Sequence, residues 1–155
     1  MRKIRPFLWF EKDAVGAAKF YTSVFKDSKI KNMETLHNTP SGQVEVVTVE
    51  LLGQEFTLLA GGPLFKFNEA ISFVVDCDTQ EEVDYYWEKL SADPKAEQCG
   101  WLKDKHGLSW QIVPTVLGKL LQDKDAKKVG RVTKAFLQMK KFDIAALKRA
   151  YESEH

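Results

Sequence analysis

Hydrophobic and polar side chains alternate strictly along residues 43–51, QVEVVTVEL, which places every second side chain on the same face. This period of two predicts a strand, and residues 54–60, QEFTLLA, predict its hairpin partner across a turn at Gly53. Two earlier segments also predict strands. Residues 4–10 are short, apolar and rich in aromatics, and residues 29–36 alternate more loosely before a turn.

A helical period lies between the first two of these strands. Residues 13–25, DAVGAAKFYTSVF, place apolar side chains at spacings of three and four. The predicted apolar face consists of Val15, Ala18, Tyr21, Val24 and Phe25. Asp13 stands directly before this face and is a suitable N-terminal cap. The first part of the chain therefore predicts a strand, a helix and three strands, in that order.

The same order of elements begins again at residue 70. Residues 70–77, AISFVVDC, predict a strand, and residues 79–91 predict a helix in which Thr79 and Glu82 form a capping box. Its apolar face comprises Val83, Tyr86, Trp87 and Leu90. Three extended pieces follow, at residues 96–101, 102–105 and 108–114.

The two predicted helices also share a sequence echo at equivalent positions. The matching pairs are Asp13 with Asp78, Phe20-Tyr21 with Tyr85-Tyr86, and Phe25 with Leu90. The echo is weak, but the repeated order of elements supports it. Together they indicate an internal duplication of a βαβββ unit.

Past Pro114 the strand pattern ends and helical spacing takes its place. One predicted face is formed by Val129, Val132, Phe136 and Met139, and a later one by Ile144, Leu147 and Tyr151. Asp125 and Asp143 are suitable caps. We expect residues 1–115 to form one domain, with modules at about 4–60 and 70–114. Residues 116–155 would form a helical extension that covers this domain or a second subunit.

Composition adds few constraints on function. A length of 155 residues favours a single domain, and a formal net charge of +1 gives no reason to expect a nucleic-acid or membrane partner. The two cysteines, Cys77 and Cys99, are too few for a disulfide-rich framework, although they leave one bridge open. No segment offers the about 20 apolar residues that cross a membrane. We therefore expect a cytoplasmic protein.

Two glycines and a proline open the segment 61–77, GGPLFKFNEAISFVVDC, which lies between two predicted strands. A phosphate-binding loop needs its glycines before a helix N-terminus, together with a conserved pattern such as GxxxxGK[ST]. This segment has neither feature. It is better interpreted as the connection between the two repeats, with Phe65 and Phe67 able to pack inward.

With this junction and with GWLKDKHGLSWQIVP at residues 100–114, the chain resembles the PhnB-like branch of the glyoxalase/bleomycin-resistance/dioxygenase superfamily. This superfamily is also called vicinal oxygen chelate. The ending QMKKFDIAALKRAY is similar to endings found in the same branch, so the resemblance covers nearly the whole chain. Its members often carry the name 3-demethylubiquinone-9 3-methyltransferase. The resemblance implies an α+β fold of two βαβββ modules around a cleft, with a helical C-terminal tail, and a homodimer.

Metal-using members of this superfamily hold a divalent ion with His or Glu side chains on the first and last strands of each module. Carried over by position, three of these places fall on Pro6, Ala70 and Gln111, and the strand 56–60 offers no acid, His or Cys. Gln111 stands where the family's glutamate would be. We therefore expect no cofactor, because the ligand set is missing, although a divalent metal at an unusual site remains open.

The resemblance places the binding cleft on the strands, and we expect ligand contacts from Leu8, Leu58, Ser72, Trp101 and Gln111. Gln111 would either form a hydrogen bond to a ligand or be a satisfied amide within its strand. Ser72 is better interpreted as an ordinary strand residue, because small hydroxyls are common in half-buried strands. Aromatic residues on or beside these strands would line a pocket for a flat or apolar molecule, or fill the two cores. These are Trp9, Phe10, Phe56, Phe65, Phe67, Phe73, Trp101 and Trp110.

Other chemistry-bearing residues give no clear constellation. His37 and His106 lie in predicted turns, and His155 ends the chain. Cys77 precedes a helix, where the helix dipole favours a thiolate, but a packed residue at the end of a strand is the simpler interpretation. We find no Ser-His-Asp or Cys-His spacing that predicts a nucleophile.

Two functions follow from these observations. The first is a protein that binds a small apolar or aromatic molecule without the usual metal, like the bleomycin-resistance relatives. The second is an enzyme, such as a lyase, a dioxygenase or the methyltransferase of the family name, with an atypical metal or cofactor site. A typical S-adenosylmethionine methyltransferase needs a doubly wound parallel sheet with a glycine-rich first loop, and this sequence predicts neither. A dimeric scaffold whose own aromatics fill the cleft is a third interpretation.

Overall fold

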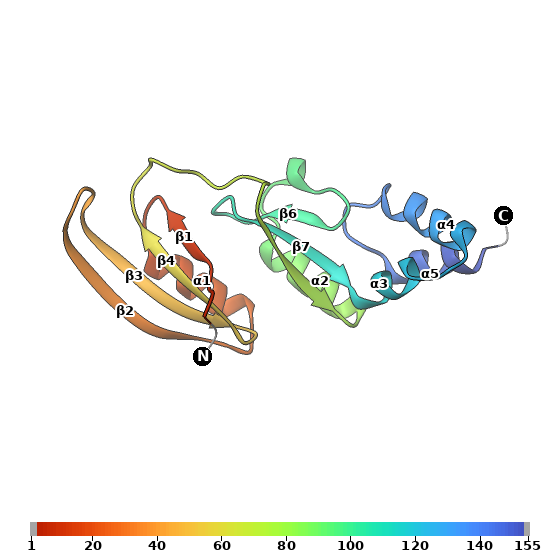
Figure 1. Cartoon of the computed structure of the whole chain (residues 1–155), viewed down its shortest axis with the longest axis horizontal. Helices are drawn as coiled ribbons and strands as arrows, with labels where there is room; N and C mark the ends of the chain where they lie inside the picture. Colours follow the sequence, from red (N-terminus) through yellow and green to blue (C-terminus); the bar gives the residue numbers. More distant parts are fainter. Residues whose placement is uncertain (1–2, 154–155) are drawn as a thin grey trace. The chain divides into compact units, whose positions relative to one another are not determined.

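The computed structural model describes residues 3–153 of the chain. The polypeptide folds into two compact units, Met1–Phe67 and Asn68–His155. Each unit has a sheet with a helix packed on one face (Figure 1). This mixed α+β architecture, in which a βα unit leads into further strands twice along the chain, confirms the predicted fold class.

The first unit is a four-stranded sheet in the order β1-β4-β3-β2. Its strands are β1 (Phe7–Phe10), β2 (Ser28–Thr39), β3 (Gly42–Leu51) and β4 (Gln54–Ala60). The chain runs antiparallel through β2, β3 and β4, whereas β1 lies parallel to β4 at the edge of the sheet. The predicted hairpin at Gly53 is confirmed, because β3 and β4 pair across it.

Helix α1 (Ala14–Val24) covers one face of this sheet. Asp13 caps it as predicted, since its carboxylate accepts a hydrogen bond of 2.9 Å from the Gly16 amide. The buried residues of the helix are Ala14, Ala17, Ala18, Tyr21 and Val24, so Val15 lies outside the buried face that we predicted. Alternate side chains of β3, such as Val47 and Val49, complete the core on this side.

The segment that follows β4 folds back and packs against β1. Trp9 Nε1 donates a hydrogen bond of 2.9 Å to the Gly62 carbonyl, and its ring meets that of Phe65 edge-on at 5.0 Å. Phe67 meets Phe10 in the same manner at 5.1 Å. A Cβ atom on Gly61 would collide with the Trp9 ring, so glycine is required for this close approach. The segment therefore joins the two units, as predicted; Phe67 is half-buried against Phe10, whereas Phe65 contacts Trp9 but is 58% exposed.

The second unit has a three-stranded sheet in the order β5-β7-β6. It comprises β5 (Ser72–Cys77), α2 (Gln80–Leu90), the 3₁₀ helix η1 (Pro94–Ala96), β6 (Trp101–Lys103) and β7 (Ser109–Pro114). Thr79 caps α2 as predicted, although Glu82 accepts a weak bond from the Asp78 amide and not from that of Thr79. Strand β5 lies parallel to β7, which repeats the arrangement of β1 and β4.

The predicted extended piece at residues 96–101 is wrong as a strand. η1 occupies its beginning, and only an isolated bridge joins Gln98 to Trp101. Between them, Cys99 and Gly100 have φ angles of 50° and 84°. Two successive left-handed residues turn the backbone sharply, and such a turn is incompatible with a strand. The second sheet therefore has three strands where the first has four.

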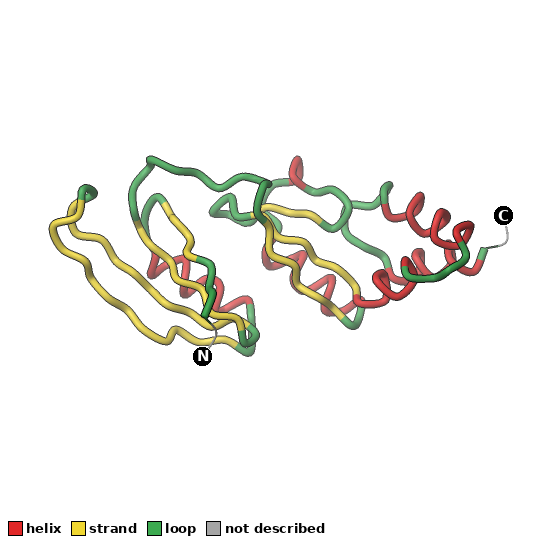
Figure 2. The backbone as a smooth tube through the Cα atoms, viewed as in Figure 1, coloured by secondary structure: helices red, strands yellow, loops and turns green. Residues whose placement is uncertain are grey.

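Three helices follow β7 and pack on the second unit (Figure 2). They are α3 (Thr115–Leu121), α4 (Ala126–Phe136) and α5 (Ile144–Glu152). Asp125 and Asp143 cap α4 and α5, as the sequence predicts. The buried cluster of this tail contains Leu117, Val132, Phe142 and Leu147. The tail thus covers its own module, which is one of the two arrangements that we expected.

Hydrogen bonds fasten this tail to the module. The amides of Cys99 and Gly100 each donate a bond of 2.8 Å, to the carbonyls of Met139 and Lys140. The side chain of Gln80 at the start of α2 donates to the Phe142 carbonyl at 3.0 Å and accepts from the Ile144 amide at 2.8 Å. The turn at Cys99 and Gly100 and the start of α2 are therefore both hydrogen-bonded to the tail.

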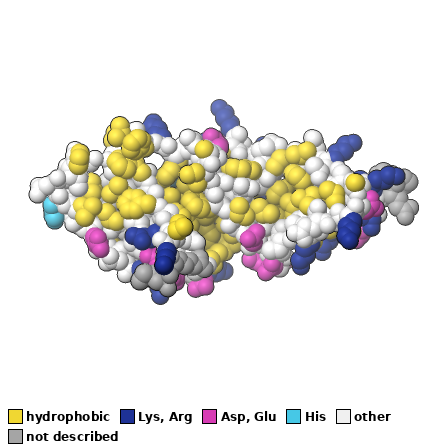
Figure 3. Space-filling view, viewed as in Figure 1, with side chains coloured by type: hydrophobic (Ala, Val, Ile, Leu, Met, Phe, Trp, Pro, Cys, Tyr) yellow, Lys and Arg dark blue, Asp and Glu magenta, His cyan; other side chains and the backbone are white. Residues whose placement is uncertain are grey.

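No helix within residues 3–153 has the length and apolar composition of a membrane span. On the face that Figure 3 draws, hydrophobic side chains reach the surface over both units. The large apolar side chains that are exposed include Phe7, Met33 and Leu36 in the first unit and Ile71 and Val74 in the second. Of those on the strands, Phe7, Leu36 and Val74 mark the sheet faces opposite the helices, whereas Met33 pairs with buried Val47 at the edge of the other face.

Candidate functional site

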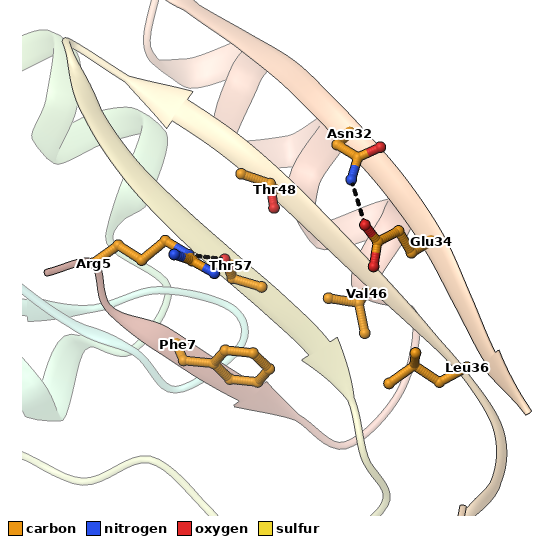
Figure 4. A pocket seen from close by; sticks show the side chains of 8 residues that line it. All are labelled: Arg5, Phe7, Asn32, Glu34, Leu36, Val46, Thr48 and Thr57. Atoms are coloured by element: carbon orange, nitrogen blue, oxygen red, sulfur yellow. Dashed lines mark hydrogen bonds between the residues drawn. The ribbon is translucent and has the colours of Figure 1, made fainter. Parts of the chain in front are cut away.

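The open face of the first sheet, opposite α1, carries a pocket of about 250 Å³ (Figure 4). All four strands or their flanks contribute to it. The lining residues are Arg5, Phe7, Asn32, Glu34, Leu36, Val46, Thr48 and Thr57. A volume of this size lies just below the roughly 300–1,000 Å³ of typical ligand sites and suits a small molecule.

Arg5 precedes β1 and extends over the neighbouring strand β4. Its Nε donates a hydrogen bond of 2.9 Å to Oγ1 of Thr57, whose side chain is buried at 2% exposure. The amide of Thr57 in turn bonds the Pro6 carbonyl at 3.0 Å, which fixes the backbone beside Arg5. This geometry directs the guanidinium along the sheet face. Its terminal nitrogens make no hydrogen bond or ion pair with residues 3–153.

The opposite side of the pocket is formed by the edge strand β2. Asn32 Nδ2 donates a hydrogen bond of 2.8 Å to Oε1 of Glu34 and thereby orients its carboxylate. Figure 4 shows this carboxylate beside Thr48 and Val46, on the far side of the face from Arg5. The hydroxyl groups of Thr48 and Thr57 and the apolar side chain of Val46 lie between the two charges. The pocket therefore combines a cation, an anion and a floor of mixed polarity.

Of the five predicted contact residues, Leu8 and Leu58 belong to the first unit. They pair with each other in the register of β1 and β4 and are 8% and 1% exposed. Because side chains alternate along a strand, both lie on the helix-covered face, one residue out of step with Phe7 and Thr57. Ligand contact by these two leucines stays a prediction, and the structure places them in the core.

The other three predicted residues come together on the open face of the second sheet. Gln111 lies between Val74 and Trp101 in the strand register. Its Nε2 donates a hydrogen bond of 2.9 Å to Oγ of Ser72. All three side chains are half-buried, and Val74 beside them is 53% exposed. The structure thus gathers Ser72, Trp101 and Gln111 into one patch, which we call the Gln111 patch.

One further polar group lies next to this patch. Ser109 pairs with Ser72 in the strand register and alternates onto the same face as Gln111. It is 1% exposed, and its hydroxyl makes no hydrogen bond with the described residues. The amide Oε1 of Gln111 likewise accepts none within residues 3–153, because its only side-chain bond is the one donated to Ser72. Two polar atoms of this face, one of them buried, therefore have no hydrogen-bond partner among residues 3–153.

The residues at the superfamily's ligand positions do not fit a metal ion. Pro6 has no side-chain donor atom, and Gln111 offers a neutral amide that already bonds Ser72. Ala70 lies before β5, where its amide bonds the side chain of Asn68. In β4, Glu55 pairs with Lys31 at 3.4 Å near the start of the strand.

No other group within residues 3–153 replaces that set. No three His, Cys, Asp or Glu side chains of this part of the chain are grouped in a manner that could hold a metal. His37 belongs to the exposed strand β2, and His106 lies in the turn between β6 and β7. The first was expected in a turn and lies instead near the end of the strand. His155 lies outside the described residues.

Neither cysteine is presented as a nucleophile. Both are free, so the open question of a single bridge is answered for this structure. Cys77 ends β5 at 0% exposure, and burial raises the pKa of its thiol to about 12, with the carboxylates of Glu82, Asp76 and Asp78 adding to the effect. The helix dipole that follows is outweighed by this burial.

Sequence reasoning missed the charged side chains of the first pocket. Arg5 is one of several basic residues in the N-terminal stretch, and Asn32 and Glu34 lie on an exposed, loosely alternating strand. The one signal available was the alternation of polar and apolar positions, because Thr48 and Glu34 fall on polar positions of their strands. Their meeting depends on cross-strand register, including an irregularity between Ile30 and Asn32 that alternation does not reveal.

Comparison with known proteins agrees with this architecture. The family model described as 3-demethylubiquinone-9 3-methyltransferase matches residues 2–113. The solved structure of a Bacillus cereus PhnB protein, described by that same name, is 35% identical with a TM-score of 0.62. The match covers 74% of this chain and 100% of the PhnB protein. Among curated protein sequences, none matches the chain.

More distant solved structures share the fold alone. The fosfomycin resistance protein FosX of Listeria monocytogenes is 13% identical with a TM-score of 0.51, over 73% of this chain and 93% of that one. A glyoxalase/bleomycin resistance protein/dioxygenase domain of Frankia is 14% identical with a TM-score of 0.50, over 72% of this chain and 96% of that one. By its match to the family model and to the PhnB protein, the chain belongs to the 3-demethylubiquinone-9 3-methyltransferase family, the PhnB-like branch of the glyoxalase/bleomycin-resistance superfamily.

Proposed function

We propose that this protein binds a small apolar or aromatic organic molecule on the open faces of its sheets, without the metal of the superfamily type. The observation that carries the proposal is the Gln111 patch, in which an oriented amide lies beside a half-buried indole. The pocket on the first sheet supports it with a concave, partly apolar surface. We further propose a homodimer in the cytoplasm, where free thiols such as Cys77 and Cys99 persist.

The chemistry of the Gln111 patch suits a flat molecule with a polar edge. The Trp101 ring provides a face on which an aromatic or apolar group can stack. The hydrogen bond from Gln111 to Ser72 leaves the amide oxygen as an oriented acceptor. A ligand that donates to this oxygen and covers the indole would satisfy both groups at once.

An enzyme with an atypical metal or cofactor site is the second candidate. The family's name favours it, because the Bacillus cereus PhnB protein, which is 35% identical to this chain, is described as a 3-demethylubiquinone-9 3-methyltransferase. Superfamily-type metal chemistry would need donors that Pro6, Ala70 and Gln111 do not supply. A methyl transfer would need a bound methyl donor, which a thermal-shift or binding assay can detect directly.

The test combines elemental analysis with ligand screening by two-dimensional NMR. Protein purified without a metal-affinity tag is analysed for Ni, Zn, Mn and Fe, then screened with these ions, with S-adenosylmethionine and with an aromatic fragment library. The metal ions and S-adenosylmethionine are followed by thermal shift, because a ligand that binds the native state raises the Tm of the protein by mass action. We expect fragments to perturb the Trp101 indole signal and the side-chain amide signal of Gln111, with Trp101→Ala abolishing the perturbation of Gln111 and Trp87→Ala, on α2, retaining it. A stoichiometric metal, or binding of S-adenosylmethionine alone, would overturn the proposal in favour of the enzyme.

A further inference from the structure

The pocket on the first sheet has opposite charges at its two ends. Arg5 reaches over the face from the β1 side, and Glu34 reaches in from β2 on the other side (Figure 4). The two form no ion pair with each other, since they are absent from contacts within 4.0 Å. Arg5 and Glu34 therefore do not neutralise each other. A ligand with the complementary charges can pair with both.

Both charged groups are oriented by a neighbouring side chain. The Nε of Arg5 is fixed by its 2.9 Å bond to Thr57, which leaves the fork of terminal N–H groups for a planar acceptor. A carboxylate matches that fork with two parallel hydrogen bonds. On the other side, Asn32 occupies Oε1 of Glu34 and leaves Oε2 without a hydrogen bond among the described residues. A protonated amine is the strongest donor for that oxygen.

The surface between the charges is mixed, because the hydroxyl groups of Thr48 and Thr57 lie there beside apolar side chains (Figure 4). Phe7, Leu36 and Val46 line it, and Phe7 is 56% exposed and Leu36 44% exposed. In the strand order β1-β4-β3-β2, three spacings of about 4.8 Å place the outer backbones about 14 Å apart. The side chains of Arg5 and Glu34 shorten this gap from both sides. Arg5 and Glu34 are also offset along the strands, because Glu34 is in register with Trp9 and not with Arg5, so a ligand that reaches both charges crosses the sheet diagonally.

We propose that this pocket binds a small zwitterion: a carboxylate held by Arg5, a protonated amine held by Glu34, and an apolar body resting on Phe7 and Val46. This inference rests on the proposed function, because it specifies the chemistry of the molecule bound on one open face. It also explains why one surface carries two oriented charges that do not pair with each other. Thr48 lies beside Glu34 and supplies a hydroxyl as a further polar contact.

The test uses three matched probes with the native protein. They are 4-(aminomethyl)benzoate, which has both charges, 4-methylbenzoate, which has only the anion, and 4-methylbenzylamine, which has only the cation. Binding is followed by NMR titration of backbone amides and of the Arg5 Nε–H signal. The variants are Arg5→Gln and Glu34→Gln, with Lys66→Gln and Glu45→Gln as exposed charge controls in the same unit.

We expect 4-(aminomethyl)benzoate to bind most tightly and to shift the amides of Val46, Thr48 and Thr57. Arg5→Gln should weaken the two carboxylate probes by about tenfold and leave the amine probe unchanged, since one charge-assisted contact is lost. Glu34→Gln should weaken only the two amine-bearing probes, and neither control should change any affinity. Arg5→Lys, which retains the charge without the fork, should recover part of the loss.

Several results would overturn the inference. One is equal affinity of all three probes, another is indifference of binding to both variants, and a third is the absence of any shift up to the solubility of the probes. If these probes fail while neutral fragments still perturb Trp101, the proposed function stands and only the zwitterion is excluded. If neither the probes nor any fragment binds, both proposals fail.

Discussion

Trp110 Nε1 donates a hydrogen bond of 2.9 Å to Oδ2 of Asp104 in the interior of the second unit. The two residues are 3% exposed each. The other carboxylate oxygen accepts from the backbone amides of His106 and Leu108, at 2.8 and 3.1 Å. One buried aspartate therefore closes the turn between β6 and β7 and fixes the indole beneath the sheet.

This arrangement predicts a large cost for removing the carboxylate. Asp104→Ala would remove the acceptor of three N–H groups, those of the Trp110 indole and of the two backbone amides, and we expect a loss of about 2–4 kcal/mol in the free energy of unfolding. Asp104→Asn should cost less, because its amide oxygen retains the two backbone bonds and only the indole loses its acceptor. Urea unfolding measures both, with the exposed Asp76→Ala as control. A loss below about 0.5 kcal/mol for Asp104→Ala would contradict this account.

Gly100 offers a second test, with a matched control in the same unit. A Cβ atom at Gly100 would collide with the ring of buried Phe142, whereas a Cβ at Gly107 meets nothing within 4 Å. Both residues have a positive φ, 84° and 82°, so alanine pays a similar backbone cost of about 1–2 kcal/mol at each.

We therefore expect Gly100→Ala to lower stability by about 1–3 kcal/mol more than Gly107→Ala does, because the tail must shift to relieve the collision. Thermal or urea unfolding gives the difference directly. Equal losses for the two variants would show that the backbone conformation alone matters and that the packing of Phe142 against this turn is loose.

Much of the fold follows from local signals. Strand β4 occupies the predicted residues 54–60, and Asp13, Thr79, Asp125 and Asp143 all cap the helices that they were expected to cap. These features depend on periodicity and on short-range hydrogen bonds, which the sequence displays. The lost strand at residues 96–101 shows the limit, since Cys99 adopts a positive φ at a turn whose amides bond the distant tail.

The candidate sites were predictable only in part, for a related reason. Alternation assigns side chains to two faces but does not say which face a helix will cover. In the second sheet the choice of Ser72, Trp101 and Gln111 brought three neighbours together. In the first sheet Leu8 and Leu58 fall on the covered face. The pocket there joins Arg5 to Glu34 through strand order, which a single sequence does not reveal.

Gln80 gives a prediction about how the tail is held. Its side chain bonds both the Phe142 carbonyl and the Ile144 amide, so Gln80→Ala would cost about 1–2 kcal/mol and expose the first turn of α5. Hydrogen exchange should show faster exchange of the Ile144 amide. Gln80→Glu retains an acceptor for this amide and should preserve its protection, while the exposed Gln43→Ala serves as a control. Unchanged exchange in Gln80→Ala would mean that the cap at Asp143 holds the helix alone.

Cys77 predicts a pH dependence of stability. Because burial raises the pKa of its thiol from an ordinary value of 9.0 to about 12, the folded protein holds the proton more tightly than the unfolded chain does. The stabilisation is complete below pH 9 and is lost as pH rises towards 12. At pH 10 the unfolding free energy should have fallen by about 1 kcal/mol on this account.

The comparison that isolates this effect is between the native protein and Cys77→Ala at pH 8 and pH 10. The alanine variant lacks the thiol, so its stability should fall by about 1 kcal/mol less over this interval. Thiol titration provides an independent check: in the folded protein at pH 8, half-buried Cys99 should react with a disulfide reagent while Cys77 reacts only after unfolding. A native protein in which Cys77 reacts as fast as Cys99 would show that β5 opens readily at its end. The raised pKa of Cys77 would then describe only a minor part of the folded ensemble.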